Sequence, residues 1–185
     1  MTLAPWDGEG LAFSCSLPGL TDTPDDNLVV RAHRLFSQAF EAAFGQAPPA
    51  CRIHLEKRIP HQAGLGGGSG NAASALRLFN AWTQAALGHA LPDDALMRLG
   101  ASLGSDVPFF LAASPSAMCR GRGESVVPLP GSLPDDAFLL AHPADCPVPT
   151  AWAYGRVRAL GDYRPRPVPY RLAGDGSIET LMKAC

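Results

Sequence analysis

The stretch over residues 57–73 most constrains what this chain can fold into, because it places five glycines directly before a helical pattern. Glycine lets the backbone adopt positive φ and approach an anion closely. The free N–H groups and the dipole of the following helix point at the same place. The stretch therefore predicts a loop that holds phosphate groups.

The spacing of these glycines excludes two common phosphate motifs. A Walker A loop ends in Gly-Lys-Ser/Thr, and no lysine follows these glycines. A dinucleotide fingerprint needs a third glycine three residues after the second, where Ser69 or Asn71 stands instead. A flexible linker is the remaining alternative, although linkers do not usually run straight into a well-patterned helix.

Helical patterns surround the loop. Apolar residues recur at helical spacing after it, with Asn71 predicted as the N-cap and Gly88 as the C-terminal stop. Asp106 follows the next helix in a turn, where an aspartate is often only a local hydrogen-bonding residue. The other expected helices cover residues 28–44, with Asp25 or Asp26 as cap, residues 93–103 up to Gly104, and residues 177–185.

The strand before the loop alternates in polarity. Over residues 51–59 it places Lys57 on the same side as Ile53 and Leu55, with Arg58 on the other side. Either cation could neutralise phosphate, and a solvated strand end is an equal alternative. The other expected strands cover residues 11–17, 117–119, 126–129 and 138–143, with a tight turn at 121–124 and an exposed connector at 164–169.

The composition limits the class of protein. The chain has 185 residues, of which 46% are hydrophobic and 17% charged, as in soluble globular proteins. A net charge of -2 argues against a general nucleic-acid binder, and we expect a cytoplasmic protein without membrane segments. The five cysteines are scattered, so neither a disulfide framework nor a zinc site is expected. Cys51 and His54 come nearest to a ligand pair, and nothing completes it.

Residues 60–73 contain a proline, a Gly-Leu pair, further glycine and serine, and Ala-Ala at the start of a helix. This pattern resembles the central motif of the GHMP kinases, which include galactokinase, homoserine kinase and mevalonate kinase. The triple glycine followed by Ser-x-Asn-Ala-Ala is most similar to the branch that phosphorylates 4-diphosphocytidyl-2-C-methyl-D-erythritol in non-mevalonate isoprenoid biosynthesis. Supporting stretches follow in the family's order at residues 26–32, 103–110, 121–124 and 177–181.

The resemblance implies an α+β fold, with the family's N-terminal ATP-binding domain at residues 1–145 and the linker and start of a second α+β domain at 146–185. It also implies ATP-dependent phosphorylation of the substrate's 2-hydroxyl, with Mg²⁺. Asp106 matches the catalytic aspartate, and Tyr154, with Trp152 as the alternative, matches an aromatic residue that stacks on cytosine. The implied ATP contacts are Asn27, Leu28, Pro60, His61, Gln62, Ala63, Gly64, Leu65, Gly66, Gly67, Gly68, Ser69, Gly70 and Asn71.

Several family features have no counterpart here. They are the opening Pro-Ala-Lys-Leu-Asn-Leu and Asp-Gly-Tyr-His motifs and the late Gly-Thr-Gly motif, and Gly70 replaces a second serine. By this comparison Met1 falls inside the family's first domain and Cys185 early in its second. The alternatives are another GHMP small-molecule kinase and a catalytically silent or truncated nucleotide-binding relative. We expect small-molecule partners, neither nucleic acid nor membrane, and the oligomeric state stays open.

Overall fold

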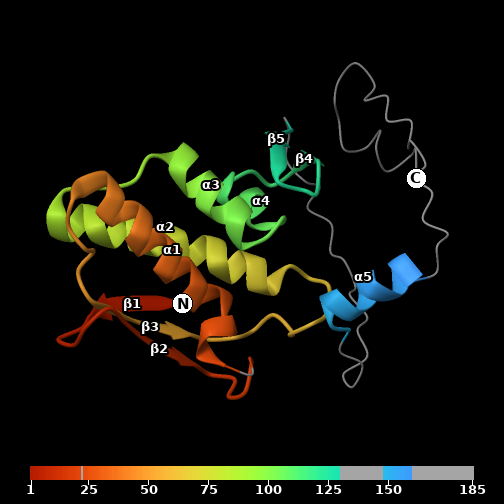
Figure 1. Ribbon diagram of the computed structural model, residues 1–185, viewed down its shortest axis with the longest axis horizontal. Coiled ribbons are helices and arrows are strands. Elements are labelled where there is room, and N and C mark those ends of the chain that lie inside the picture. The colour runs from red at the N-terminus through yellow and green to blue at the C-terminus, as the bar shows by residue number, and fades with distance from the viewer. Residues whose placement is uncertain (22, 130–147, 160–185) are drawn as a thin grey trace.

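The computed structural model describes residues 1–21, 23–129 and 148–159 (Figure 1). The predicted strand at 138–143, the connector at 164–169 and the helix at 177–185 lie outside these residues, and so does the predicted domain boundary at 145/146. Helices and sheets together confirm the predicted α+β class. The elements are β1 (Thr2–Pro5), β2 (Leu11–Cys15), the 3-10 helix η1 (Pro24–Asp26), α1 (Leu28–Phe44), β3 (Cys51–Leu55), α2 (Gly67–Leu87), α3 (Asp93–Leu103), α4 (Val107–Leu111), β4 (Ala117–Arg120), β5 (Ser125–Pro128) and α5 (Thr150–Ala159).

A three-stranded sheet lies on one side of α1 and α2 (Figure 1). Its strand order is β1-β3-β2, with β3 antiparallel to β1 and parallel to β2. The predicted alternation on β3 is confirmed, because Cys51, Ile53 and Leu55 are buried while Arg52 and His54 are exposed. The buried side joins the core, to which α1 contributes Phe36 and Phe40 and α2 contributes Leu76 and Phe79.

The N-cap of helix α1 lies just after the two predicted caps, Asp25 and Asp26. Asn27 is the N-cap, and its side-chain Oδ1 accepts a hydrogen bond of 2.9 Å from the Val29 N–H. The prediction of Asp25 or Asp26 as cap was wrong, because both belong to η1. Asn, Asp and Ser are comparable N-caps, so three candidates in a row left the choice to the tertiary structure.

Helix α2 begins at Gly67, with Gly66 as its N-cap in the left-handed region at φ 65°. The prediction of Asn71 as N-cap was therefore wrong. The first turn contains glycines, which carry no apolar pattern to reveal a helix, so the pattern begins only at Ala72. The predicted stop at Gly88 is confirmed by its φ of 72° and by its N–H, which donates to the Gln84 carbonyl.

The remaining elements extend this layer. Helix α3 begins after Pro92 and ends before Gly104, as predicted. The short helix α4 contacts both α2 and α3. Strands β4 and β5 pair in an antiparallel hairpin, which confirms the predicted tight turn at residues 121–124. None of the helices in the described ranges is both long and apolar enough to cross a membrane.

Candidate functional site

Residues 60–70, which include the loop after β3 and the first residues of α2, are called the glycine loop below. Its backbone takes positive φ at Gln62, Gly64 and Gly66. The loop forms most of a cavity of about 390 Å³, together with four residues from elsewhere in the chain. The lining residues are Leu28, Lys57, Pro60, His61, Gln62, Ala63, Gly64, Leu65, Gly66, Gly67, Gly68, Ser69, Asp106 and Tyr154. We call this space the loop cavity.

The structure thus brings most of the predicted site residues to one place. The predicted catalytic Asp106 and the predicted substrate contact Tyr154 line the same cavity as the loop. Gly70 and Asn71, further along α2, are not among the residues that line it. Asn27 lines a separate cavity beside it.

Two positions of the loop require glycine for reasons of space. A Cβ on Gly66 would lie 2.9 Å from Cζ of Phe110, and one on Gly67 would lie 2.9 Å from Cγ2 of Ile59. Gly66 also has positive φ, which disfavours any other residue there. The backbone at the start of α2 is therefore packed closely, with its first N–H groups available to an anion.

Lys57 and Arg58 are neighbours in sequence but differ in their surroundings. The Lys57 ammonium lies 2.9 Å from where a Cβ of Gly67 would stand, so it lies at the N-terminus of α2. Arg58 points away and pairs with Glu56 at 3.1 Å, with 81% of its side chain exposed. The alternation along residues 51–59 is the signal that separates them, because it places Lys57 on the side of buried Leu55.

The position of Lys57 is electrostatically unfavourable in the free protein. Burial lowers the pKa of Lys57, an effect partly opposed by Cys15. In the described part of the chain, no carboxylate pairs with it. The N-terminus of a helix carries partial positive charge, so a cation there is disfavoured. A bound anion would favour both the ammonium and the helix terminus.

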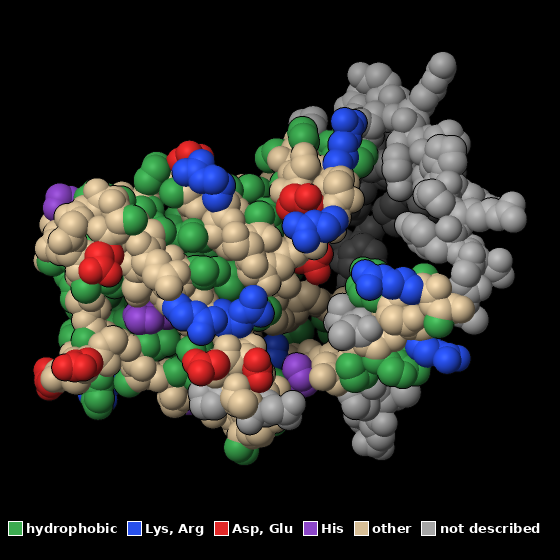
Figure 2. All heavy atoms as spheres, in the orientation of Figure 1, with side chains coloured by type: hydrophobic (Ala, Val, Ile, Leu, Met, Phe, Trp, Pro, Cys, Tyr) green, Lys and Arg blue, Asp and Glu red, His purple; other side chains and the backbone are tan. Residues whose placement is uncertain are grey.

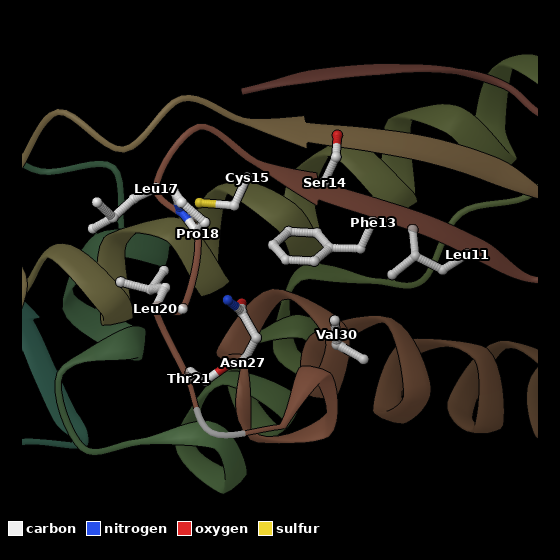
Figure 3. A pocket seen from close by; sticks show the side chains of 11 residues that line it. Leu11, Phe13, Ser14, Cys15, Leu17, Pro18, Leu20, Thr21, Asn27 and Val30 are labelled. Carbon is white, nitrogen blue, oxygen red and sulfur yellow. The ribbon is translucent and has the colours of Figure 1, made fainter.

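A second cavity of about 390 Å³ lies between β2, the chain after it and the start of α1. Figure 3 shows the Asn27 side chain pointing into it, between Phe13 and Leu20. Asn27 is only 5% exposed, and its Oδ1 is used by the Val29 N–H. Its neighbour Leu28 lines the loop cavity, so the start of α1 contributes to both cavities. We call this second space the Asn27 cavity.

Hydrogen bonds connect the segment after β2 with the segment between β3 and the glycine loop. The Ser16 hydroxyl accepts a 2.8 Å bond from the Lys57 N–H, and the Ser16 N–H donates to the Leu55 carbonyl. The segment after β2 is thereby fixed to the segment that leads into the glycine loop. The first of these segments lines the Asn27 cavity, and the second lines the loop cavity.

Asp106 stands immediately before α4, with its carboxylate exposed and without a capping bond to that helix. Besides the loop cavity, it lines a smaller cavity of about 220 Å³, to which Leu65 and Gly66 also contribute. That smaller cavity includes Cys119 and Gly123 of the β4–β5 hairpin. The sequence indicated a turn at 121–124 and gave no sign that it reaches Asp106.

Tyr154 belongs to α5 and is 65% exposed, while Trp152 is 61% exposed and is not among the residues lining the loop cavity. The chain before α5 contacts the glycine loop, because the Val148 N–H donates to the Gln62 carbonyl at 3.2 Å. The helix therefore begins beside the loop. Of the two aromatic candidates, Tyr154 is the one that reaches the cavity.

No group of three metal-ligating side chains occurs within residues 1–21, 23–129 and 148–159. Cys51 and His54, the nearest pair in sequence, lie on opposite faces of β3, since Cys51 is buried and His54 is exposed. Burial raises the pKa of Cys51 to about 11, so its thiol is protonated at neutral pH. The pair does not form a site.

Comparison with known proteins finds a family match over the centre of this chain. Residues 27–114 match the GHMP kinases N terminal domain. That segment contains Asn27, the glycine loop and Asp106. Most residues lining the Asn27 cavity precede this segment, and the 121–124 turn and Tyr154 follow it.

Relatives match over most of this chain. A 4-diphosphocytidyl-2-C-methyl-D-erythritol kinase from Solidesulfovibrio magneticus is 42% identical over 160 residues, 86% of this chain and 50% of the relative. One of the same name from Salinibacter ruber is 36% identical over 170 residues, 89% of this chain and 55% of the relative. A crystal structure of a 4-(cytidine 5'-diphospho)-2C-methyl-D-erythritol kinase matches with a TM-score of 0.56 and 34% identity, covering 90% of this chain and 54% of that one. The chain spans about half the length of the curated relatives it matches.

Proposed function

We propose that the protein transfers the γ-phosphate of ATP to an alcohol, because residues 27–114 match the GHMP kinases N terminal domain. The observation that carries this proposal is the shared cavity of Asp106 and the glycine loop. One provides a base and the other a place for phosphates. We propose as substrate the 2-hydroxyl of 4-diphosphocytidyl-2-C-methyl-D-erythritol, named for the relatives, and hence a role in isoprenoid precursor biosynthesis.

ATP would lie across the loop cavity and the Asn27 cavity. Its phosphates would contact the first N–H groups of α2 and the Lys57 ammonium, which has no carboxylate partner in the described residues. Its adenine would enter the Asn27 cavity, whose walls include the Phe13 ring and the Asn27 amide. An aromatic wall with one amide is suited to a flat, polar-edged base.

Mg²⁺ fits the residues of the loop cavity. The Ser69 hydroxyl and the Asp106 carboxylate line it, and oxygen atoms are the ligands that Mg²⁺ prefers. The ion usually binds through one or two such groups together with substrate phosphates. When bound, it would neutralise charge on the phosphates.

The residues of this chain would then act mainly by positioning. The substrate oxygen attacks the γ-phosphorus as the bond between that phosphorus and the β-γ bridging oxygen breaks. Asp106 accepts the proton that the hydroxyl loses, and ADP leaves. Phosphoryl transfer depends chiefly on placement and electrostatic stabilisation, so few residues need to take part.

Tyr154 is the proposed contact for the cytosine of the substrate. Its ring lines the loop cavity and is largely exposed, so one face is free to receive a base. Base stacking on an aromatic side chain contributes about 1–3 kcal/mol in nucleic-acid binders. A contribution of that size would favour a cytidine diphosphate substrate over a free polyol.

The test is turnover of ATP with 4-diphosphocytidyl-2-C-methyl-D-erythritol and Mg²⁺, with the product located by phosphorus NMR. We expect one new phosphomonoester on the substrate and a stoichiometric amount of ADP. ATP binding is measured on the same sample by calorimetry. ATP binding without a new phosphoester would contradict the kinase and favour a silent nucleotide-binding protein; homoserine or mevalonate as the better acceptor would contradict the substrate.

A further inference from the structure

Within the described residues, no hydrogen bond sets the orientation of the Asp106 carboxylate. Helix α4 starts directly after Asp106, and the side chain makes no capping bond. In the described ranges, no ion pair involves this carboxylate either. A general base must point at the proton that it removes. Packing around Asp106 must therefore limit where its oxygens lie.

Gly123 of the β4–β5 hairpin provides such a contact. A Cβ on Gly123 would lie 3.4 Å from the Ser105 carbonyl oxygen and 3.7 Å from Oδ1 of Asp106. The two residues also line the same cavity of about 220 Å³. Gly123 therefore lies close to one carboxylate oxygen, in a cavity that Leu65 and Gly66 of the glycine loop also line.

The turn that carries Gly123 is fixed by its own hydrogen bonds. Oε2 of Glu124 accepts a bond of 2.6 Å from the Arg122 N–H. The Gly123 N–H donates to the Arg120 carbonyl at 3.1 Å, next to the last strand pair. Backbone hydrogen bonds from Glu124 itself and from Arg122 lower the pKa of the Glu124 carboxyl, so it stays charged at neutral pH. The turn is thus built independently of Asp106.

We propose that Gly123 is a positioning residue for Asp106, because any side chain at this position would contact the carboxylate. This inference rests on the proposed kinase function. Asp106, Gly123 and part of the glycine loop line one cavity. A methyl group at 123 would occupy space beside Oδ1, restrict the orientations of the carboxylate and exclude water from it.

The test compares Gly123→Ala with Gly121→Ala, a matched control in the same turn. Both glycines have positive φ, 116° at Gly123 and 72° at Gly121. A methyl on Gly121 would meet only the Glu124 side chain, at 3.0 Å and beyond. We expect Gly123→Ala to lower kcat by about 10- to 100-fold, the scale of a misplaced catalytic group, with the Kd for ATP within about twofold of wild type. Gly121→Ala should change kcat by less than about threefold, since its methyl is remote from the base.

A second readout does not depend on turnover. Excluding water from a carboxylate disfavours its charged form and raises its pKa. The pKa of Asp106, measured by carbon NMR of the side-chain carboxyl, should rise in Gly123→Ala and stay unchanged in Gly121→Ala. The low-pH limb of kcat should move to higher pH in the same variant only.

Three outcomes decide the matter. A raised Asp106 pKa in Gly123→Ala alone, with kcat lowered, supports the proposal. Equal losses of kcat in both variants, in step with their melting temperatures, would overturn it, because strain in the turn would then explain everything. If the wild type binds ATP without turnover, the proposed kinase function is wrong. An unchanged Asp106 pKa in Gly123→Ala would show, independently of turnover, that Gly123 does not control the carboxylate.

Discussion

The glycine loop and the 121–124 turn are two glycine-containing turns that line one cavity together with Asp106. In the loop, a Cβ on Gly66 or Gly67 would come within 2.9 Å of a neighbouring side chain. In the turn, the atoms nearest to a Cβ on Gly123 are 3.4 Å away or more. The loop therefore excludes a side chain by space, whereas the turn has room for a methyl group. The first set of glycines maintains the fold of the site, and the second controls the surroundings of one carboxylate.

Replacing Gly66 by Ala should give the largest effect. Positive φ and the contact with Phe110 combine there, so we expect a loss of about 2–4 kcal/mol in the free energy of unfolding and no measurable ATP binding. Gly64→Ala is the control, because Gly64 has φ 72° but nothing within 4 Å of a Cβ, and about 1–2 kcal/mol is expected. Urea unfolding measures both. Equal losses would show that close packing at Gly66 is unimportant.

Removing the Lys57 ammonium tests the phosphate side of the comparison. We expect Lys57→Met to weaken ATP binding by roughly 10- to 100-fold, the scale of one charge-assisted hydrogen bond, and to leave adenosine binding unchanged. Arg58→Met is the control, since Arg58 is exposed and paired with Glu56, and its ATP affinity should stay within about twofold. Calorimetry measures both ligands. An equal loss of adenosine affinity would show that Lys57 does not act through the phosphate groups of ATP.

Lys57→Met should also change how the stability of the ligand-free protein depends on pH. Here the substitution is expected to be favourable, whereas it weakens ATP binding. The folded-state pKa of Lys57 is lowered by burial, so its protonated form opposes folding below that pKa. This unfavourable contribution disappears as pH rises through the unfolded-state pKa. Lys57→Met should therefore melt slightly higher than wild type at pH 7, and the difference should shrink in alkaline solution. A lower melting temperature at pH 7 would contradict the unfavourable placement.

Gly70 should give the smallest effect. A Cβ there would lie 3.7 Å from Phe110, an ordinary contact, and the residue is helical. Gly70→Ala should raise stability by about 0.5–1 kcal/mol through helix propensity, with no change in ATP affinity. Gly70→Ser adds a hydroxyl at the start of α2 and should strengthen ATP binding a few-fold. If Ala and Ser act alike on ATP affinity, the hydroxyl does not reach the phosphates.

The regular part of the fold could be predicted from the sequence. Apolar spacing gave α1, α2 and α3, and glycine marked where α1 and α2 end. Helix starts were less predictable. Asn27 competed with two neighbouring aspartates, and α2 begins in glycines that carry no apolar pattern. Where several neighbouring residues are equally suitable caps, tertiary contacts decide among them, and the local sequence does not identify the cap.

The candidate site was predictable where it is continuous in sequence. The glycine loop was identified from its own residues, and Asp106 from a resemblance. Lys57 was not separated from Arg58, although the alternation that buries Leu55 also turns Lys57 inward. Gly123 could not be found, because its role depends on a contact with Asp106 made only in the folded chain.

The central claim is that the glycine loop and Asp106 form one site for phosphoryl transfer, and Asp106→Asn tests it most directly. This change keeps the size of the side chain and removes the base. Turnover and ATP affinity should be measured on one preparation, with Ser102→Ala on the exposed face of α3 as control. We predict that turnover falls below detection while the Kd for ATP stays within about threefold of wild type. The substitution removes the base and leaves the ground-state contacts to ATP in place. Turnover near the wild-type rate would contradict the account.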